Sequence, residues 1–182
     1  MTDSSLGLPI EAVPTPSLLL DLDAFDRNVR KIAHYLDERG VAWRPHVKGH
    51  KSPILANRMV EAGAIGVTCA KVSEAEVMVA SGIDEILIAN QPATSEAWER
   101  VARLQGAASV AVAIDHAAHV RLAREAASGF GVTIPLVIEV EIGMNRAGVR
   151  STAQGVDLAR EIVDGGQVLA GVMGDEGHLL TA

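Results

Sequence analysis

The chain has 182 residues, of which 48% are hydrophobic and 21% are charged, and this composition excludes disordered and fibrous proteins. The formal net charge of −7 argues against a nucleic-acid-binding protein, which usually carries a basic patch or stripe. Cys69 is the only cysteine, so no intrachain disulfide is possible and a reducing, cytoplasmic compartment is expected. No apolar run is long enough to cross a bilayer, and the first residues lack the pattern of a secretory signal.

The first third of the chain begins with an extended lead-in over residues 1–17 and then a predicted strand over 18–22. Asp23 is expected to cap a helix that ends near residue 39. A second strand is predicted over 41–48. Ser52 and Pro53 are typical of a helix N-cap and first helical position, so they predict a helix over 53–62.

The same alternation continues to the end of the chain. Ser73 and Glu76 form a possible capping box, Thr94 and Asp115 are expected to cap two further helices, and Ser151 or Thr152 is expected to cap the last. Strands are predicted over 65–69, 85–89, 109–114, 134–140 and 167–173, with helices ending near 82, 104, 127 and 163. About seven strands that alternate with helices at such intervals indicate parallel pairing.

Two parallel architectures fit this alternation. A doubly wound sheet fits the length, but the chain has neither G-x-G-x-x-G after its first strand nor a Walker A sequence. A (β/α)8 barrel fits the rhythm but typically needs about 250 residues, so the chain would form only about six to seven βα units. The terminal segment 174–182, which begins as a polar loop after the last predicted strand, supports this α/β fold, an incomplete TIM barrel.

Polar residues follow many of the predicted strands, and the active groups of a barrel lie at the carboxyl ends of its strands. These residues are Lys48, Asn90, Gln91 and Asp115, with the segments 141–146 and 175–178. Their common placement indicates an enzyme.

The predicted strand 41–48 carries three basic side chains, Arg44, His46 and Lys48, at alternate positions and therefore on one face. If that face points inward, the cations need an anionic partner. Positive neighbours and burial would favour the neutral amine of Lys48, which could then attack a carbonyl group. An ordinary exposed lysine at a strand-to-helix turn is an equally good interpretation.

Three further sites have two interpretations each. Arg146 lies in a loop with two glycines, where it could hold a carboxylate, a phosphate or a ring nitrogen, or could pair with a glutamate of the same segment. His178 could act as an acid or base, or could be a surface histidine. His116 and His119 have a spacing that could contact one metal ion, but without a third ligand they are more typical of a helix surface.

Three segments carry a resemblance to a known family: LDLD at 20–23, RPHVKGHKSP at 44–53 and EIGMNRAG at 141–148. Together they resemble the D-threonine aldolase and D-serine dehydratase family, which consists of fold-type III pyridoxal-phosphate enzymes with an alanine-racemase-like N-terminal barrel. The resemblance extends from about Pro14 to Leu180. It implies that residues 1–182 are one truncated pyridoxal-phosphate-binding barrel domain and that the family's C-terminal β-domain is absent.

The resemblance also implies roles for individual residues. Lys48 would bind pyridoxal 5'-phosphate covalently and act in catalysis, and Arg146 would face the pyridine nitrogen. His46 and Gln91 would complete the cofactor-binding set, and His178 would be an acid or base near the substrate hydroxyl. No metal ligand is expected in this chain, although full-length members are expected to use a divalent metal, Mn or Zn.

The reaction implied by the resemblance is the cleavage of D-3-hydroxy amino acids into glycine and an aldehyde. The alternatives are a D-serine dehydratase, a D-amino-acid deaminase or a racemase on the same scaffold, or an inactive fragment that binds the cofactor without turnover. The expected partner is a small D-amino acid, with neither nucleic acid nor membrane, and a full-length form would be a homodimer. Gly49 and Asp175 differ from the threonine and tyrosine usual in the family.

An incomplete barrel would leave a strand edge and apolar surface exposed. The 182-residue chain alone is therefore expected to fold poorly or aggregate, and to bind the cofactor weakly.

Overall fold

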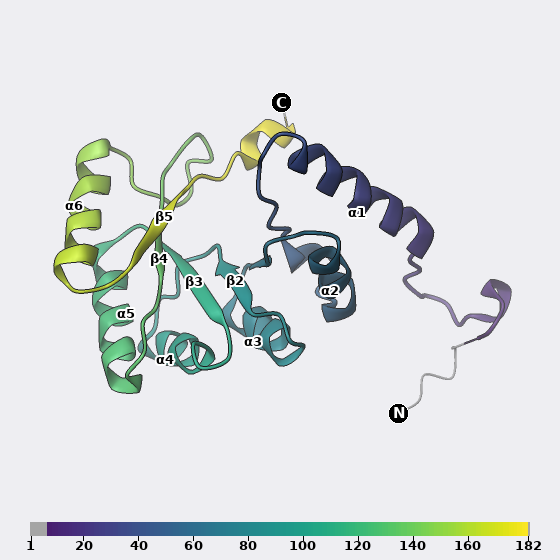
Figure 1. Ribbon diagram of the computed structural model, residues 1–182, viewed down its shortest axis with the longest axis horizontal. Helices are drawn as coiled ribbons and strands as arrows, with labels where there is room; N and C mark the ends of the chain where they lie inside the picture. Colours follow the sequence, from purple (N-terminus) through teal and green to yellow (C-terminus); the bar gives the residue numbers. More distant parts are fainter. Residues whose placement is uncertain (1–6, 182) are drawn as a thin grey trace.

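The computed structural model describes residues 7–181 and contains a five-stranded parallel sheet in the order β1-β2-β3-β4-β5 (Figure 1). The strands are β1 (Val67–Cys69), β2 (Glu85–Ile88), β3 (Ser109–Ile114), β4 (Leu136–Glu139) and β5 (Leu169–Met173). Each strand pairs with its neighbour in the sequence, and right-handed crossovers between such strands place the connecting helices on one face. This is the α/β architecture of an incomplete barrel, as predicted.

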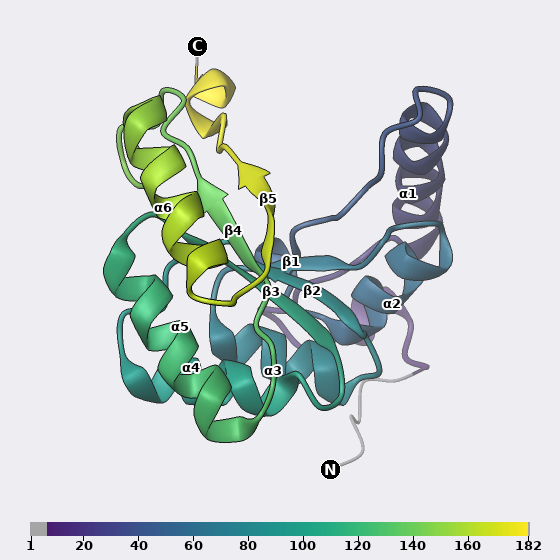
Figure 2. The ribbon, with the colours of Figure 1, turned by 60° about the vertical axis from the view of Figure 1, so that its left-hand side comes forward.

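Of the helices, the first lies away from the strands and the others lie on the outer side of the sheet (Figure 2). The helices are α1 (Leu22–Asp37), α2 (Pro53–Glu61), α3 (Val72–Ala80), α4 (Ser95–Leu104), α5 (Ala117–Phe130) and α6 (Thr152–Asp164), with short 3-10 helices η1 (Ile10–Ala12), η2 (Val47–Gly49) and η3 (Gly177–Thr181). The segment before α1 extends away from the body of the molecule (Figure 1). No helix between residues 7 and 181 has the length and apolar character needed to cross a membrane.

The hydrophobic core lies between the sheet and helices α3 to α6. Its largest fully buried side chains include Trp98 of α4, Met78 of α3 and Ile114 of β3. Cys69 is also fully buried, and burial raises the pKa of its thiol to about 12, which agrees with an inert core residue rather than a nucleophile.

Three predicted helix caps are confirmed. The hydroxyl oxygens of Ser52, Thr94 and Ser151 each accept a hydrogen bond from the backbone nitrogen three residues later, at 3.4, 3.3 and 3.2 Å. These bonds satisfy amide groups that have no partner within the first turn of a helix.

The predicted strand over 18–22 is wrong. Leu18, Leu19 and Leu20 are exposed, and no strand among the described residues pairs with them. The predicted cap at Asp23 is also wrong, because the Asp21 carboxylate accepts from the Ala24 nitrogen at 2.9 Å and α1 begins at Leu22. An apolar run forms a strand only where a neighbouring strand takes up its hydrogen bonds, and a local pattern does not contain that information.

The predicted strand over 41–48 is only partly present. The segment runs beside β1 through hydrogen bonds from Ile65 to Trp43 and from Thr68 to Pro45, each 2.8 Å, and His46 forms a single bridge with Thr68. Pro45 has no amide proton to donate, and the chain tightens into η2 immediately after His46. Of the seven predicted strands, five are strands, the segment 41–48 is an extended segment beside β1, and 18–22 is not a strand.

The predicted capping box of Ser73 and Glu76 is wrong. Helix α3 begins at Val72, and the Glu74 carboxylate instead accepts from the Ala70 nitrogen at 2.8 Å. Glu76 binds the Arg100 guanidinium of α4 through two hydrogen bonds of 2.7 and 2.6 Å.

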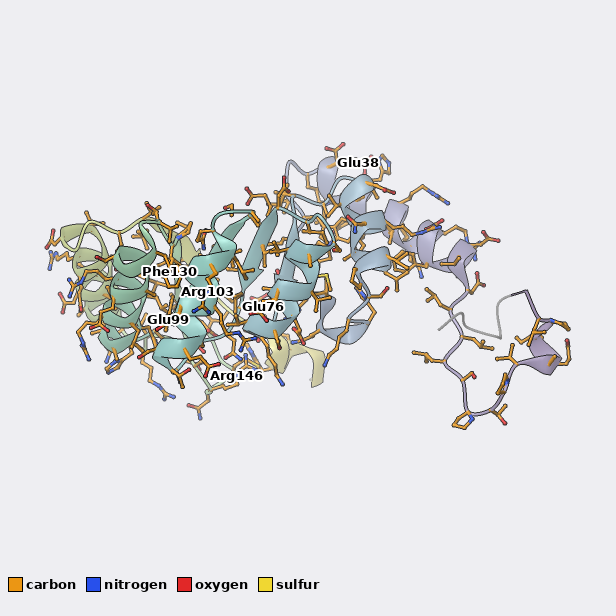
Figure 3. The ribbon with its side chains drawn as sticks, turned by 90° about the horizontal axis from the view of Figure 1, so that it is seen from below. Glu38, Glu76, Glu99, Arg103, Phe130 and Arg146 are labelled. Atoms are coloured by element: carbon orange, nitrogen blue, oxygen red, sulfur yellow. The ribbon has the colours of Figure 1, made fainter. Side chains whose placement is uncertain are left out.

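The outer surfaces of α3, α4 and α5 are joined by charged and aromatic side chains (Figure 3). The Arg103 guanidinium lies 3.2 Å from the Glu99 carboxylate and 5.1 Å from the centre of the Phe130 ring. These contacts connect α4 to α5 on the side of the layer that faces solvent.

Candidate functional site

A cavity of about 470 Å³ lies at the carboxyl edge of the sheet. All four predicted cofactor-binding residues, His46, Lys48, Gln91 and Arg146, line it. The remaining lining residues come from the ends of β1, β2, β4 and β5 and include Thr68, Ala70, Leu87, Ala89, Asn90, Glu139, Met173, Gly174, Asp175 and Glu176. The topology of the sheet thus gathers residues that are far apart in the sequence, as a barrel does at its active face.

Lys48 lies in the turn η2 and its side chain is exposed, which agrees with the second of the two interpretations, a lysine exposed at a strand-to-helix turn. The chain has already left the sheet at His46, and the alternation of a strand no longer applies two residues later. Arg44, predicted on the same face, does not line the cavity, and its guanidinium lies 4.0 Å from the carboxylate of Glu85 at the start of β2. The cations that share the cavity are therefore Lys48 and Arg146.

The His46 imidazole is held by the turn that carries Lys48. Its Nδ1 accepts a hydrogen bond from the Lys48 backbone nitrogen at 3.2 Å. Burial lowers the pKa of His46, and the positive charge of Lys48 lowers it further, so the neutral ring is favoured. A neutral ring whose Nδ1 accepts carries its proton on Nε2, which makes that atom a hydrogen-bond donor.

Gln91 and Glu139 form a pair at the ends of β2 and β4. The Gln91 Nε2 donates a hydrogen bond to Glu139 Oε2. Glu139 is only 4% exposed, and burial raises the pKa of its carboxyl, opposed by the bond from Gln91 and the charge of Arg146. Glu139 was not among the residues predicted to lie in the site. A signal existed, because Glu139 is the single charge within the apolar predicted strand 134–140.

Arg146 pairs with Asp175 rather than with a glutamate side chain of its own segment. Its Nη2 lies 2.8 Å from Asp175 Oδ2, while its backbone nitrogen donates to Glu141 Oε2 at 3.0 Å. The Gly177 amide and the Arg146 guanidinium both lower the pKa of Asp175. The residue that pairs with Arg146 is thus the aspartate that stands where the family resemblance would predict a tyrosine.

The loop that carries Arg146 is fixed by Asp115 at the end of β3. Asp115 Oδ2 accepts from the Gly148 nitrogen at 2.9 Å. The predicted N-cap role of Asp115 is wrong, because His116 caps α5 by accepting from the Ala118 nitrogen at 3.0 Å. Gly148 has φ +105°, and a Cβ there would lie 2.5 Å from the Glu141 nitrogen, so the close approach requires glycine.

His178 does not line the cavity but packs against the same loop. A Cβ on Gly143 would lie 2.5 Å from its Nε2. Its role as an acid or base stays a prediction. The rings of His116 and His119 have centroids 6.2 Å apart, and residues 7–181 contain no group of three or more His, Cys, Asp or Glu that could hold a metal ion.

The donor set fits pyridoxal phosphate. Lys48 supplies an exposed primary amine for a covalent bond to an aldehyde, and Arg146 and His46 supply donors for an anionic ring compound with acceptor atoms. The volume is also within the usual range of about 300–1,000 Å³ for small-molecule sites.

Comparisons with known proteins show the family and the fold to which this chain is similar. Residues 20–178 match the family model described as alanine racemase, N-terminal domain. The chain is 37% identical over 158 residues to a D-threonine aldolase from Arthrobacter sp, and the aligned residues cover 87% of this chain and 42% of that protein.

Two solved structures have the same fold over most of the chain. A D-threonine aldolase from Filomicrobium marinum superposes with a TM-score of 0.86 at 41% identity, covering 88% of this chain and 44% of that one. A D-threo-3-hydroxyaspartate dehydratase from Delftia sp. HT23 superposes with a TM-score of 0.84 at 30% identity, covering 90% and 44%. The chain thus spans about two fifths of the length of the proteins it matches.

Proposed function

This chain belongs to the family of the alanine racemase N-terminal domain, and we propose that it forms the cofactor-binding barrel of a pyridoxal-phosphate-dependent lyase. The substrate would be a D-3-hydroxy amino acid, cleaved between Cα and Cβ to give glycine and an aldehyde. The observation that carries the proposal is the cavity that Lys48 shares with His46, Gln91 and Arg146. Similarity to a D-threonine aldolase supports the choice of reaction.

When bound, pyridoxal phosphate supplies an electron sink for the negative charge that develops at the substrate α-carbon. Lys48 would hold the cofactor covalently through Nζ, and the His46 bond to the Lys48 backbone would fix the turn from which that side chain extends. The His46 Nε2 proton and the Arg146 guanidinium would orient acceptor atoms of the bound ring. We also propose that Arg146 acts on the pyridine nitrogen of the cofactor and that the whole enzyme uses a divalent metal, Mn or Zn.

The experiment that tests the cofactor assignment is chemical mapping. The chain is incubated with pyridoxal phosphate, reduced with borohydride and analysed by peptide mass spectrometry. We expect a pyridoxyl adduct on Lys48 that disappears in Lys48→Ala and persists in the matched control Lys51→Ala. Lys51 is an exposed lysine 3.7 Å from Glu74, so it has the same chemistry but a different position. Labelling spread evenly over exposed lysines would contradict the assignment.

A second reaction class is supported by the similarity to the Delftia dehydratase. A dehydratase would convert the same substrate class into a keto acid and ammonia. Product analysis after incubation of the loaded protein with D-threonine and D-threo-3-hydroxyaspartate separates the two, because glycine appears only in the aldolase reaction. Formation of the enantiomer would favour a racemase, and an adduct on Lys48 without any product would favour cofactor binding without turnover.

A further inference from the structure

Glu139 occupies an unusual position for a charged residue. Among residues 7–179, whose burial the structure describes, the buried polar or charged residues are Thr68 and Glu139. Glu139 reaches the cavity from the end of β4. A buried carboxyl group requires hydrogen-bonding partners. The side-chain partner here is the Gln91 amide, which lines the same cavity.

The chemistry of the pair restricts how the Gln91 amide is oriented. An ionised carboxylate only accepts hydrogen bonds, so it must face Nε2 of Gln91, and Oε1 is left as an acceptor for other groups. A protonated carboxyl carries an O–H that can donate to Oε1 instead. The amide would then turn over and present its NH2 group, which is a donor.

We propose that Glu139 is a positioning residue whose protonation state decides which end of the Gln91 amide faces the cavity. With Glu139 ionised, Gln91 presents an acceptor, which suits a hydroxyl or ammonium group of a bound small molecule. With Glu139 protonated, Gln91 presents a donor, and that match is lost. The identity of the bound molecule rests on the proposed function, but the coupling between Glu139 and Gln91 does not.

Some groups around Glu139 favour its ionised form and others oppose it. Arg146, in the loop after β4, favours the carboxylate, as does the bond from Gln91 after β2. Burial opposes ionisation, and Asp115 after β3 and Asp175 after β5 oppose it further. The balance raises the pKa of Glu139, so its proton is released closer to neutral pH than that of an exposed glutamate.

The first test needs no ligand. The side-chain amide signals of the 15N-labelled chain are followed by NMR between about pH 4 and pH 9, with Gln91→Ala identifying the Gln91 signal. We expect the Gln91 signal to shift with pH in the natural chain and to stay constant in the isosteric variant Glu139→Gln. The same shift in both proteins, or none in the natural chain, would overturn the proposal.

The second test uses pyridoxal phosphate as the probe. Acidification should raise the dissociation constant in both proteins, but about five- to tenfold more in the natural chain than in Glu139→Gln. Only the natural chain loses the hydrogen bond between the ligand and the acceptor atom of Gln91 when Glu139 is protonated. A purely structural Glu139 would give parallel pH profiles, and that result would overturn the proposal. If the probe does not bind at all, the proposed function fails while the NMR result still decides the coupling.

A charge-swapped pair provides a rescue experiment. In Gln91→Glu alone, two carboxyl groups face each other, so we expect affinity for pyridoxal phosphate to fall more than about tenfold. Adding Glu139→Gln restores a donor opposite the new carboxylate and leaves an acceptor facing the cavity. The double variant should therefore bind within about threefold of the natural chain at pH 8. Equal affinity of the double variant and Gln91→Glu would contradict the proposal.

Discussion

The indole Nε1 of Trp98 donates a hydrogen bond of 2.9 Å to the Pro92 carbonyl oxygen. Trp98 is fully buried in α4, whereas Pro92 belongs to the loop that carries Asn90 and Gln91 to the cavity. A core side chain therefore fixes one wall of the candidate site, and core stability and site geometry are coupled at this point.

Trp98→Phe should destabilise the chain by about 1–3 kcal/mol, because it leaves the Pro92 carbonyl without its donor and removes buried volume. Urea denaturation measures the change. Trp43→Phe is the matched control, since Trp43 is only half-buried, and it should cost less than about 1 kcal/mol. Equal losses in the two variants would show that the Trp98 bond contributes nothing specific.

Asp115→Ala should cost about 1–3 kcal/mol, because the part-buried Gly148 amide loses its acceptor. The variant should also weaken binding of pyridoxal phosphate, since Gly148 anchors the loop of Arg146. Asp157→Ala, which removes a carboxylate with a 75% exposed side chain, should leave both quantities unchanged. Denaturation and cofactor titration test the two effects separately, and normal binding by a destabilised Asp115→Ala would exclude the anchoring role.

Arg146→Ala should separate binding from stability. The pair with Asp175 is half-exposed, with side-chain exposures of 58% and 34%, and such pairs contribute about 0–1 kcal/mol to folding. We expect a nearly unchanged denaturation midpoint but affinity for pyridoxal phosphate at least about tenfold lower. Arg160→Ala removes an equally long cation from an exposed ion pair and should change neither. Unaltered affinity in Arg146→Ala would remove this residue from the site.

Acid should destabilise the chain from about pH 6.5 downward. Burial lowers the pKa of His46, His50 and His119 below the ordinary value of 6.5. Each of these histidines therefore binds its proton more tightly in the unfolded chain than in the folded one. The stability that comes from the neutral histidine is fully present above pH 6.5 and is lost as pH falls toward the pKa of the folded state. The slope is at most about 1.4 kcal/mol per pH unit for each proton.

Denaturation between about pH 5 and pH 8 measures this slope. In the natural chain the Ser52 amide donates to His50 Nδ1 at 3.0 Å, and His50→Asn keeps an acceptor for this amide. The variant removes one titrating group, so its stability should depend less steeply on pH. The control His34→Gln changes a histidine with a 73% exposed side chain and should not. A profile that is flat in the natural chain would contradict the expectation.

The chain alone should self-associate through its edge strand. Val172 of β5 is 71% exposed, and β5 has a neighbour on one side only. Val172→Lys should therefore increase the monomer fraction measured by light scattering. Val163→Lys introduces the same charge at a 59% exposed helix position and should have less effect. A natural chain that stays monomeric at the same concentration would contradict this prediction.

The sequence predicted those parts of the structure that depend on local chemistry. Caps at Ser52, Thr94 and Ser151 require only a hydroxyl near an amide three residues later, and β3 was predicted with its observed bounds. The strand over 18–22 failed because pairing depends on distant segments. The residues Lys48, His46, Gln91 and Arg146 were predicted by resemblance, and the sheet brings them to one cavity.

The partners of the site residues were not predictable in the same way. Asp175 lies 29 positions from Arg146, and Glu139 lies 48 positions from Gln91. Either acidic residue could equally well have faced solvent, and several basic or amide side chains were available to each. Only the parallel register of β2, β4 and β5 decides which of them meet.

The strictly sequential strand order has a consequence for how the protein is made. Each strand needs only the one before it, so the sheet can extend strand by strand while the ribosome is still adding residues. The Lys48 turn is synthesised first, but Asp175 leaves the ribosome about 130 residues later, after several seconds at usual elongation rates. Most of the sheet is therefore synthesised before the cavity is complete. A nascent chain cannot bind a ligand beside the Arg146–Asp175 pair until synthesis has passed β5.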